Sequence, residues 1–234
     1  MNIFVYGDSN SWGYLDDGTG LRYERRWPEV MKQYLTGAYL VSQDCLPGRT
    51  VANDDSENGS HLNGRTNLLS SILAHSPIDH VLLMLGTNSF KYRMNLSAER
   101  ICVQLLEAAC VISTSGAGAG TWHDTVSPTV TIICPPILGM RAEDPNWVGF
   151  SDWIGGAEKS RALRRLLIEA SATSKFDYFD SNRVVSSSDR DPIHLSAENH
   201  HKLGEEMAKH ILRLKIDKIN NSFNDRMNQR LTKD

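Results

Sequence analysis

The chain has 234 residues, of which 40% are hydrophobic and 23% charged, and its formal net charge at pH 7 is -3. This length and composition suit one globular domain with a well-buried core. The small charge gives no indication of nucleic acid or an anionic membrane as a partner, and no apolar run approaches the ~20 residues of a membrane helix.

Strands and helices alternate along the sequence, beginning with the apolar run NIFVY at residues 2–6. Runs that are apolar throughout indicate strands buried on both faces, and apolar residues three and four apart indicate helices. Pro28 suits the first turn of a helix, and Ser97 suits an N-cap. In chain order, the predicted elements are strand 2–6, helix 25–35, strand 38–43, a helix ending at 67–76, strand 79–86, helix 97–113, strand 129–134, helix 156–174, strand 176–181 and helix 196–214.

This alternation predicts an α/β fold with a parallel sheet of five strands covered by helices on both faces. Ligands of such sheets bind beyond the carboxyl ends of the strands. Polar or Gly/Pro-rich motifs follow the first four predicted strands, and we expect them to meet at one rim: GDS, PGRT, GTNS and PPIL.

Two segments lie outside the alternation. The Gly/Ala-rich stretch 114–127 predicts a surface loop or a small hairpin. The polar segment 215–234 has Ile216, Ile219, Phe223 and Met227 three to four residues apart, which favours a helix of unknown partner. We therefore divide the chain into a main domain, 1–214, and a C-terminal tail, 215–234.

The other titratable residues show no metal-binding pattern. Cys45, Cys102, Cys110 and Cys134 lack CxxC spacing, and we expect buried free thiols. His200 and His201 are adjacent on a predicted helix, so they cannot share a metal, and we expect solvated side chains. Residues 1–6 resemble a strand rather than a secretory signal, which predicts a soluble cytoplasmic protein.

Three residues have the chemistry of a serine nucleophile and its activating pair. Ser9 follows the first strand, while Asp191 and His194 lie three residues apart in DPIHLS. A serine hydroxyl needs a base to remove its proton, and the imidazole needs a carboxylate to orient it. Pro192 disfavours helical geometry at Asp191, so the loop stays extended until the final helix begins.

Two further residues offer hydrogen-bond donors at the same rim. Acyl transfer builds negative charge on the carbonyl oxygen, and each donor aimed at that charge stabilises it by roughly 3 kcal/mol. Gly48 can present its backbone N–H, and Asn88 its side-chain amide. Alone, Gly48 would be interpreted as a turn glycine and Asn88 as a strand-terminating asparagine.

Together these motifs resemble the SGNH hydrolase superfamily, also called GDSL esterases. Its four blocks are matched in order by GDSNSWG, LPGRT, LGTNS and DPIHLS, and RRWPEVM adds a likeness to the bacterial arylesterase branch. The resemblance implies a flavodoxin-like three-layer α/β/α sandwich and a hydrolase without metal or cofactor. It also implies Ser9 as nucleophile, His194 as base, Asp191 as its orienter, and an oxyanion hole of Ser9 N–H, Gly48 N–H and Asn88.

The sequence departs from the family pattern beside the nucleophile. Asn10 replaces the usual Leu, which predicts a more polar floor and leaves the substrate preference open, and Ser89 replaces the usual Asp. We expect the substrate pocket to be formed by residues near the rim, namely Asn10, Trp12, Tyr14, Ile137, Leu138 and Ile193.

The sequence therefore predicts a serine esterase for small carboxylic esters, with acetyl or short acyl groups and aryl esters included. The arylesterase likeness and the tail spacing suggest a homo-oligomer. Two alternatives stay open: a non-catalytic ligand-binding module of the same fold, and a flavodoxin-like nucleotide or flavin protein. An α/β-hydrolase is excluded, because Ser11 stands where GxSxG requires Gly, and because Asp and His are nearly adjacent.

Overall fold

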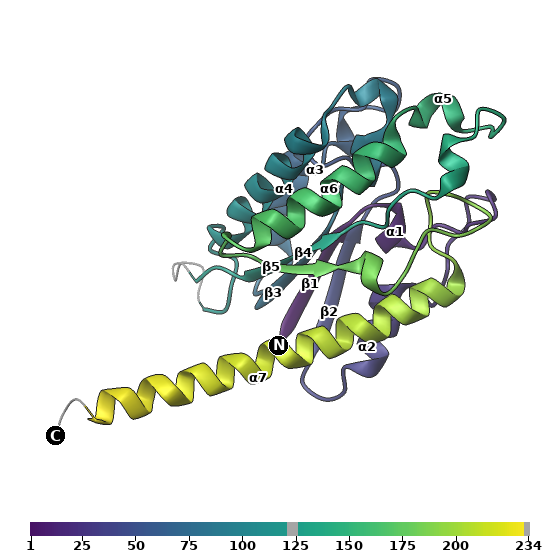
Figure 1. The fold of residues 1–234 in the computed structure, drawn as a ribbon. Coiled ribbons are helices and arrows are strands. Elements are labelled where there is room, and N and C mark those ends of the chain that lie inside the picture. Colours follow the sequence, from purple (N-terminus) through teal and green to yellow (C-terminus); the bar gives the residue numbers. More distant parts are fainter. Residues whose placement is uncertain (121–125, 232–234) are drawn as a thin grey trace.

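A five-stranded parallel sheet forms the centre of the molecule (Figure 1). The computed structural model describes residues 1–120 and 126–231, with side chains up to 215 in the second range. The strand order is β2-β1-β3-β4-β5. Their bounds are β1 Asn2–Gly7, β2 Leu40–Cys45, β3 His80–Met84, β4 Thr129–Cys134 and β5 Asp177–Asp180.

The predicted fold class is confirmed. Every predicted strand is present, with ends shifted by at most two residues, and all four strand pairs are parallel. The central strands β1 and β3 are buried almost throughout, as their continuous apolar runs predict. The carboxyl ends of β1, β2 and β3 therefore lie side by side, which brings the first three motifs to one rim.

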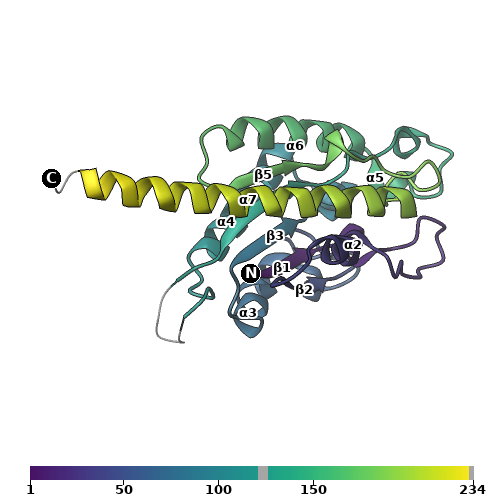
Figure 2. The same cartoon turned by 90° about the horizontal axis from the view of Figure 1, so that it is seen from below.

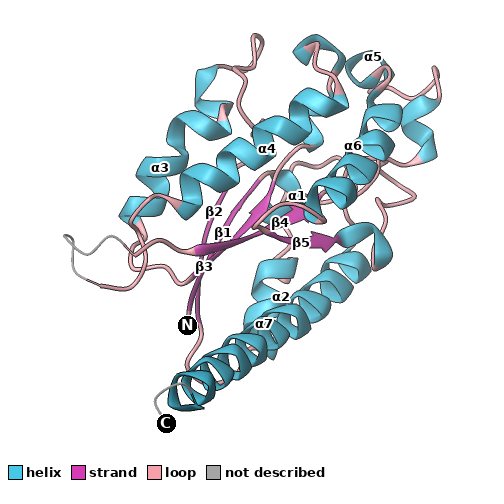
Figure 3. Cartoon of the chain, turned by 60° about the vertical axis from the view of Figure 1, so that its left-hand side comes forward, coloured by secondary structure: helices cyan, strands magenta, loops and turns pink. Residues whose placement is uncertain are grey.

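Helices cover both faces of the sheet (Figure 3). On one face lie α3 (Gly64–Ala74), α4 (Ala98–Ser113) and α6 (Gly156–Ser171), and on the other lie α2 (Trp27–Tyr34) and α7 (Ala197–Leu231). Side chains alternate along β1, so that Phe4 and Tyr6 enter the first core whereas Ile3 and Val5 enter the second. This is the expected three-layer sandwich.

Short helical turns occupy the loops after the strands and before α3 and α6. They are α1 (Ser9–Trp12), α5 (Phe150–Trp153), η1 (Ser60–Leu62), η2 (Thr87–Phe90), η3 (Tyr92–Met94), η4 (Met140–Glu143) and η5 (Ser181–Arg183). The sequence did not predict them, because one turn is too short to show a helical period.

Helix α7 extends well beyond the body of the molecule (Figure 2). It continues from Ala197 to Leu231 without interruption, so the predicted division at residue 214 falls inside one helix and stays a prediction. No helix within the described residues has the length and apolar character needed to cross a membrane.

The 114–127 stretch lies partly outside the described residues, which omit 121–125. Its ends are joined by a hydrogen bond from Gly118 N–H to Val126 O at 2.8 Å. The cysteine prediction is half right: all four thiols are free, but only Cys102 and Cys134 are buried. Cys45 is half-buried and Cys110 exposed, because Cys110 lies on the outer side of α4.

Candidate active site

The chain passes from β1 into the short helix α1 through Asp8 alone, and Ser9 is the first residue of that helix. Asp8 caps the short helix, and its Oδ1 accepts a hydrogen bond from Asn10 N–H at 3.0 Å. Gly13 ends the helix with a φ of +92°, a left-handed conformation that favours glycine. Ser9 is consequently held at the carboxyl end of β1, next to the central strand β3.

The loop before α7 brings Asp191 and His194 to Ser9. His194 Nε2 lies 3.0 Å from Ser9 Oγ, and His194 Nδ1 lies 2.6 Å from Asp191 Oδ2. The other carboxylate oxygen of Asp191 accepts a hydrogen bond from Ile193 N–H at 2.8 Å. These contacts join residues 185 positions apart into one serine–histidine–aspartate arrangement with the geometry of an activated nucleophile.

Asn10 connects the nucleophile turn to the histidine loop. Its Nδ2 donates to Ile193 O and its Oδ1 accepts from Leu195 N–H, both at 3.1 Å. The side chain thus holds the backbone on both sides of His194, and the residue is only 1% exposed. Asn10 does not line the pocket over Ser9 as predicted, because its side chain is directed to the loop around His194.

The three residues predicted to supply oxyanion donors, Ser9, Gly48 and Asn88, line one pocket. Gly48 has a φ of +86°, and neither its N–H nor that of Ser9 is used in a hydrogen bond within the described residues. Asn88 Nδ2 donates one hydrogen to Arg49 O at 3.2 Å, which fixes the amide and leaves its second hydrogen available. The predicted oxyanion donors therefore come from the ends of β1, β2 and β3.

Arg49 links the carboxyl ends of β1 and β2 by hydrogen bonds. The residue is 3% exposed, and its guanidinium lies over the Tyr6 ring, 4.1 Å from the ring centre. Nη1 donates to Gly7 O at 3.2 Å and to Asp44 O at 2.6 Å, and Nη2 pairs with the Asp44 carboxylate at 2.7 Å. Arg49 directly follows Gly48, but its role was not predicted from the sequence.

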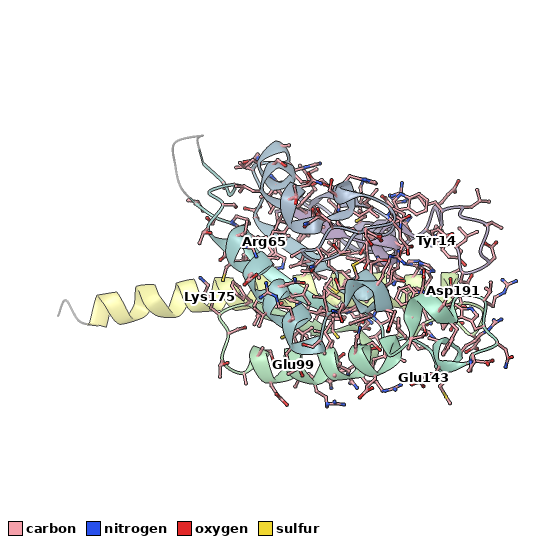
Figure 4. The ribbon with its side chains drawn as sticks, turned by 90° about the horizontal axis from the view of Figure 1, so that it is seen from above. Tyr14, Arg65, Glu99, Glu143, Lys175 and Asp191 are labelled. Atoms are coloured by element: carbon pink, nitrogen blue, oxygen red, sulfur yellow. The ribbon has the colours of Figure 1, made fainter. Side chains whose placement is uncertain are left out.

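A pocket of about 310 Å³ opens over Ser9. Tyr14 forms one wall, with its ring stacked on the His194 imidazole at 4.5 Å between ring centres. Figure 4 shows Tyr14 and Asp191 at the same end of the molecule. The lining residues are Ser9, Tyr14, Gly18, Pro47, Gly48, Asn88, Lys91, Trp147, Gly149, Asp152, Trp153, Asp191, Ile193 and His194.

Only part of the predicted pocket lies there. Tyr14 and Ile193 line it, but Trp12, Ile137 and Leu138 do not. Trp12 packs instead against Arg22, whose guanidinium carbon lies 4.8 Å from the centre of the Trp12 ring. Leu138 is buried in the core between the sheet and α6. Placement at the rim does not determine which way a side chain points.

The comparisons with known proteins agree with this geometry. The family model described as GDSL-like Lipase/Acylhydrolase matches residues 3–207. The chain belongs to this family. The predicted resemblance is thereby confirmed, and membership implies a carboxylic-ester hydrolase. No sequence match was found among proteins with curated functions.

Two solved structures show how similar this family member is to others. The inhibitor-bound aryl esterase of M. Smegmatis is 29% identical with a TM-score of 0.83, and Est24, a carbohydrate acetylesterase from Sinorhizobium meliloti, is 31% identical with a TM-score of 0.82. Each alignment covers 92% of this chain and 99% of the other chain.

Two carboxyl groups in this GDSL-family site have opposite pKa shifts. Burial would raise the pKa of Asp191, but its hydrogen bond to His194 and the charge of that residue outweigh burial and lower it. Burial raises the pKa of Asp8 to about 6, since the hydrogen bond from Asn10 compensates only in part. Asp191 is therefore the carboxylate suited to orienting the imidazole.

Elsewhere, the histidine pair on α7 differs from the prediction. His200 is fully buried rather than solvated, and its Nδ1 accepts a hydrogen bond from Trp27 N–H at 3.3 Å at the start of α2. Burial lowers the pKa of His200 to about 3, so it is neutral. In the described ranges, no group of three or more His, Cys, Asp or Glu side chains could hold a metal ion.

Proposed function

We propose that this protein is a serine esterase that hydrolyses small carboxylic esters through an acyl-enzyme. The observation that carries the proposal is the short chain of contacts from Ser9 Oγ to His194 and from His194 to Asp191, at 3.0 and 2.6 Å. The same pocket is lined by Ser9 and Gly48, whose backbone N–H groups make no hydrogen bond within the described residues.

The proposed mechanism follows from these contacts. Ser9 Oγ attacks the ester carbonyl while His194 Nε2 accepts its proton, and Asp191 stabilises the resulting imidazolium. The carbonyl oxygen gains negative charge and is stabilised by Ser9 N–H, Gly48 N–H and the Asn88 amide. His194 then protonates the departing alcohol. Water, deprotonated by His194, attacks the acyl-enzyme and releases the acid and free Ser9.

The size of the pocket supports small substrates. A volume of about 310 Å³ is near the lower end of the range for small-molecule sites. The similar structures are named an aryl esterase and a carbohydrate acetylesterase, which supports acetyl and short-acyl esters, aryl esters included. A cytoplasmic location and a homo-oligomeric assembly stay predictions from the sequence.

A chromogenic acetyl ester tests the proposal directly. Ser9→Ala should lower kcat by about 10⁴-fold or more, because the nucleophile is lost while the binding groups stay. Ser70→Ala, which removes an exposed hydroxyl on α3, serves as the matched control and should retain wild-type turnover. Circular dichroism should show that both variants keep the fold.

Two outcomes would contradict the proposal. Turnover by Ser9→Ala at the wild-type rate would remove Ser9 from the mechanism. Absence of turnover in wild-type protein across acyl chains of two to eight carbons would favour the alternative, a non-catalytic ligand-binding module of the same fold.

A further inference from the structure

Lys91 is a charged residue in the pocket to which the proposed mechanism gives no role. It follows η2, three positions after Asn88, and its side chain lines the same pocket as Ser9 and His194. The residue is half-buried, and its Nζ lies 5.6 Å from the centre of the Trp153 ring. The ammonium is thus held against an aromatic wall at the site of the reaction.

No carboxylate of the described structure forms a direct ion pair with Lys91. Its Nζ makes no hydrogen bond or ion pair with any described residue. The two acidic residues that line the pocket pair with other residues: Asp152 pairs at 3.1 Å with Arg93, which also pairs with Asp55 and Glu57, and Asp191 pairs with His194. Lys91 is also the one Lys or Arg among the lining residues. The Lys91 ammonium therefore lines the pocket without a direct hydrogen-bond or ion-pair partner among the described residues.

This charge is in an environment that favours a negative partner. Burial and the neighbouring Arg93 lower the pKa of Lys91, and the nearby carboxylates offset them only in part. A half-buried ammonium without a partner lacks the hydrogen bonds that it makes in water, and a charged acceptor restores them. Trp153 keeps the ammonium in place, because a cation is attracted to the face of an indole ring.

We propose that Lys91, held by Trp153, forms a subsite for a negatively charged group of the substrate, in the first instance a carboxylate. The subsite makes the enzyme prefer anionic esters to neutral esters of the same shape. This inference rests on the proposed esterase function, since it names the class of ester that the same pocket takes. The carboxylate belongs either to the acyl half or to the alcohol half of the ester.

Two pairs of esters show whether the carboxylate belongs to the alcohol half or to the acyl half of the substrate. In the first pair, 4-acetoxybenzoate and 4-acetoxybenzamide, the charge is on the alcohol half. In the second, monomethyl succinate and methyl succinamate, it is on the acyl half. Charge-assisted hydrogen bonds contribute enough for a preference of about tenfold or more in kcat/KM for the charged member of one pair.

Substitution at residue 91 should change that ratio in a defined way. Lys91→Met should reduce the charged-to-neutral ratio to about one, Lys91→Glu should invert it, and Lys91→Arg should keep it above one. Raised ionic strength should weaken the wild-type preference, because salt screens the pair.

Lys175 offers a matched control. Its Nζ also lies over an aromatic ring, 5.4 Å from the centre of Phe176, but at the opposite end of the molecule from Tyr14 and Asp191 (Figure 4). Lys175→Met removes the same charge from the protein and should leave the ratio at its wild-type value. A general effect of net charge would lower the ratio in both lysine variants equally.

Calorimetric titration of Ser9→Ala protein with the same esters separates this inference from the proposed function. Tighter binding of one charged ester, lost when Lys91→Met is added, supports the subsite even if wild-type protein hydrolyses none of them. Hydrolysis of the neutral esters with a ratio near one in both pairs, or a ratio that Lys91→Met leaves unchanged, overturns the subsite while the esterase stands.

Discussion

Asn10 shows how one side chain can set the distance between nucleophile and base. We predict that Asn10→Leu, which introduces the residue usual in the family, lowers kcat about 10- to 100-fold with little change in KM. The reason is that the backbone around His194 loses two hydrogen bonds and the imidazole is no longer held against Ser9. Steady-state kinetics of the purified variant test this, and an unchanged kcat would contradict it.

Asp8 gives a second prediction at the residue scale, on stability against pH. Its pKa is raised in the folded protein from 3.8 to about 6, so its contribution to stability is complete below pH 4 and is lost as the pH rises through 6. Asp8→Asn keeps the helix cap, and because the amide does not ionise, the variant does not lose stability at this position as the pH rises. The variant should exceed wild type in free energy of unfolding by about 1 to 3 kcal/mol at pH 8.

Urea denaturation at pH 4, 6 and 8 measures this difference. The gap between Asp8→Asn and wild type should shrink as the pH falls. A gap that is constant across the three pH values would show that Asp8 does not titrate in this range.

The site residues that could be predicted from the sequence are those that the course of the backbone alone brings to the site. Ser9, Gly48 and Asn88 follow strand ends, and parallel strands bring such ends together whatever the side-chain rotamers. Lys91, Arg49 and the two pocket tryptophans were missed, since their part in the site depends on side-chain direction. Lys91 had one available signal, its place two residues beyond the LGTNS motif that contains Asn88.

At the scale of elements, the close packing of α2 on α7 depends on Gly204. A Cβ atom at this position would lie 2.5 Å from Val30 Cβ and 2.7 Å from Trp27 O. Gly204→Ala should therefore destabilise the protein by about 1–3 kcal/mol through overpacking. In an uncrowded helix the same substitution is stabilising, so the sign of the change tests the contact.

Thermal unfolding monitored by circular dichroism measures the effect, with Lys202→Ala on the exposed side of α7 as the control. A melting temperature for Gly204→Ala at or above that of wild type would show that the two helices separate at little cost.

The elements that the sequence predicted well are those with a long apolar pattern. The five strands and the helices α2, α3, α4 and α6 each bury a regular set of side chains, and this period is visible without knowledge of the fold. The burial of His200 was not predictable in this way. Its partner Trp27 is 173 positions away, and only the contact between two helices brings them together.

At the scale of the whole molecule, the domain occupies most of the chain and the end of α7 projects from it. The family model stops at residue 207. We predict that removal of residues 216–234 leaves esterase activity within about twofold of the full chain, because Lys215, which lies 5.0 Å from the Tyr39 ring, is retained. Activity and melting temperature of the shortened protein are the measurements. Loss of either would assign the end of the helix to the domain.

Covalent labelling by a fluorophosphonate tests most directly whether Ser9 is an activated nucleophile. Wild-type protein should gain one adduct, located on Ser9 by mass spectrometry of its peptides, and His194→Gln should react much more slowly because the base is absent. Wild-type protein that is fully folded yet forms no adduct at Ser9, or that forms one equally fast without His194, would contradict the account.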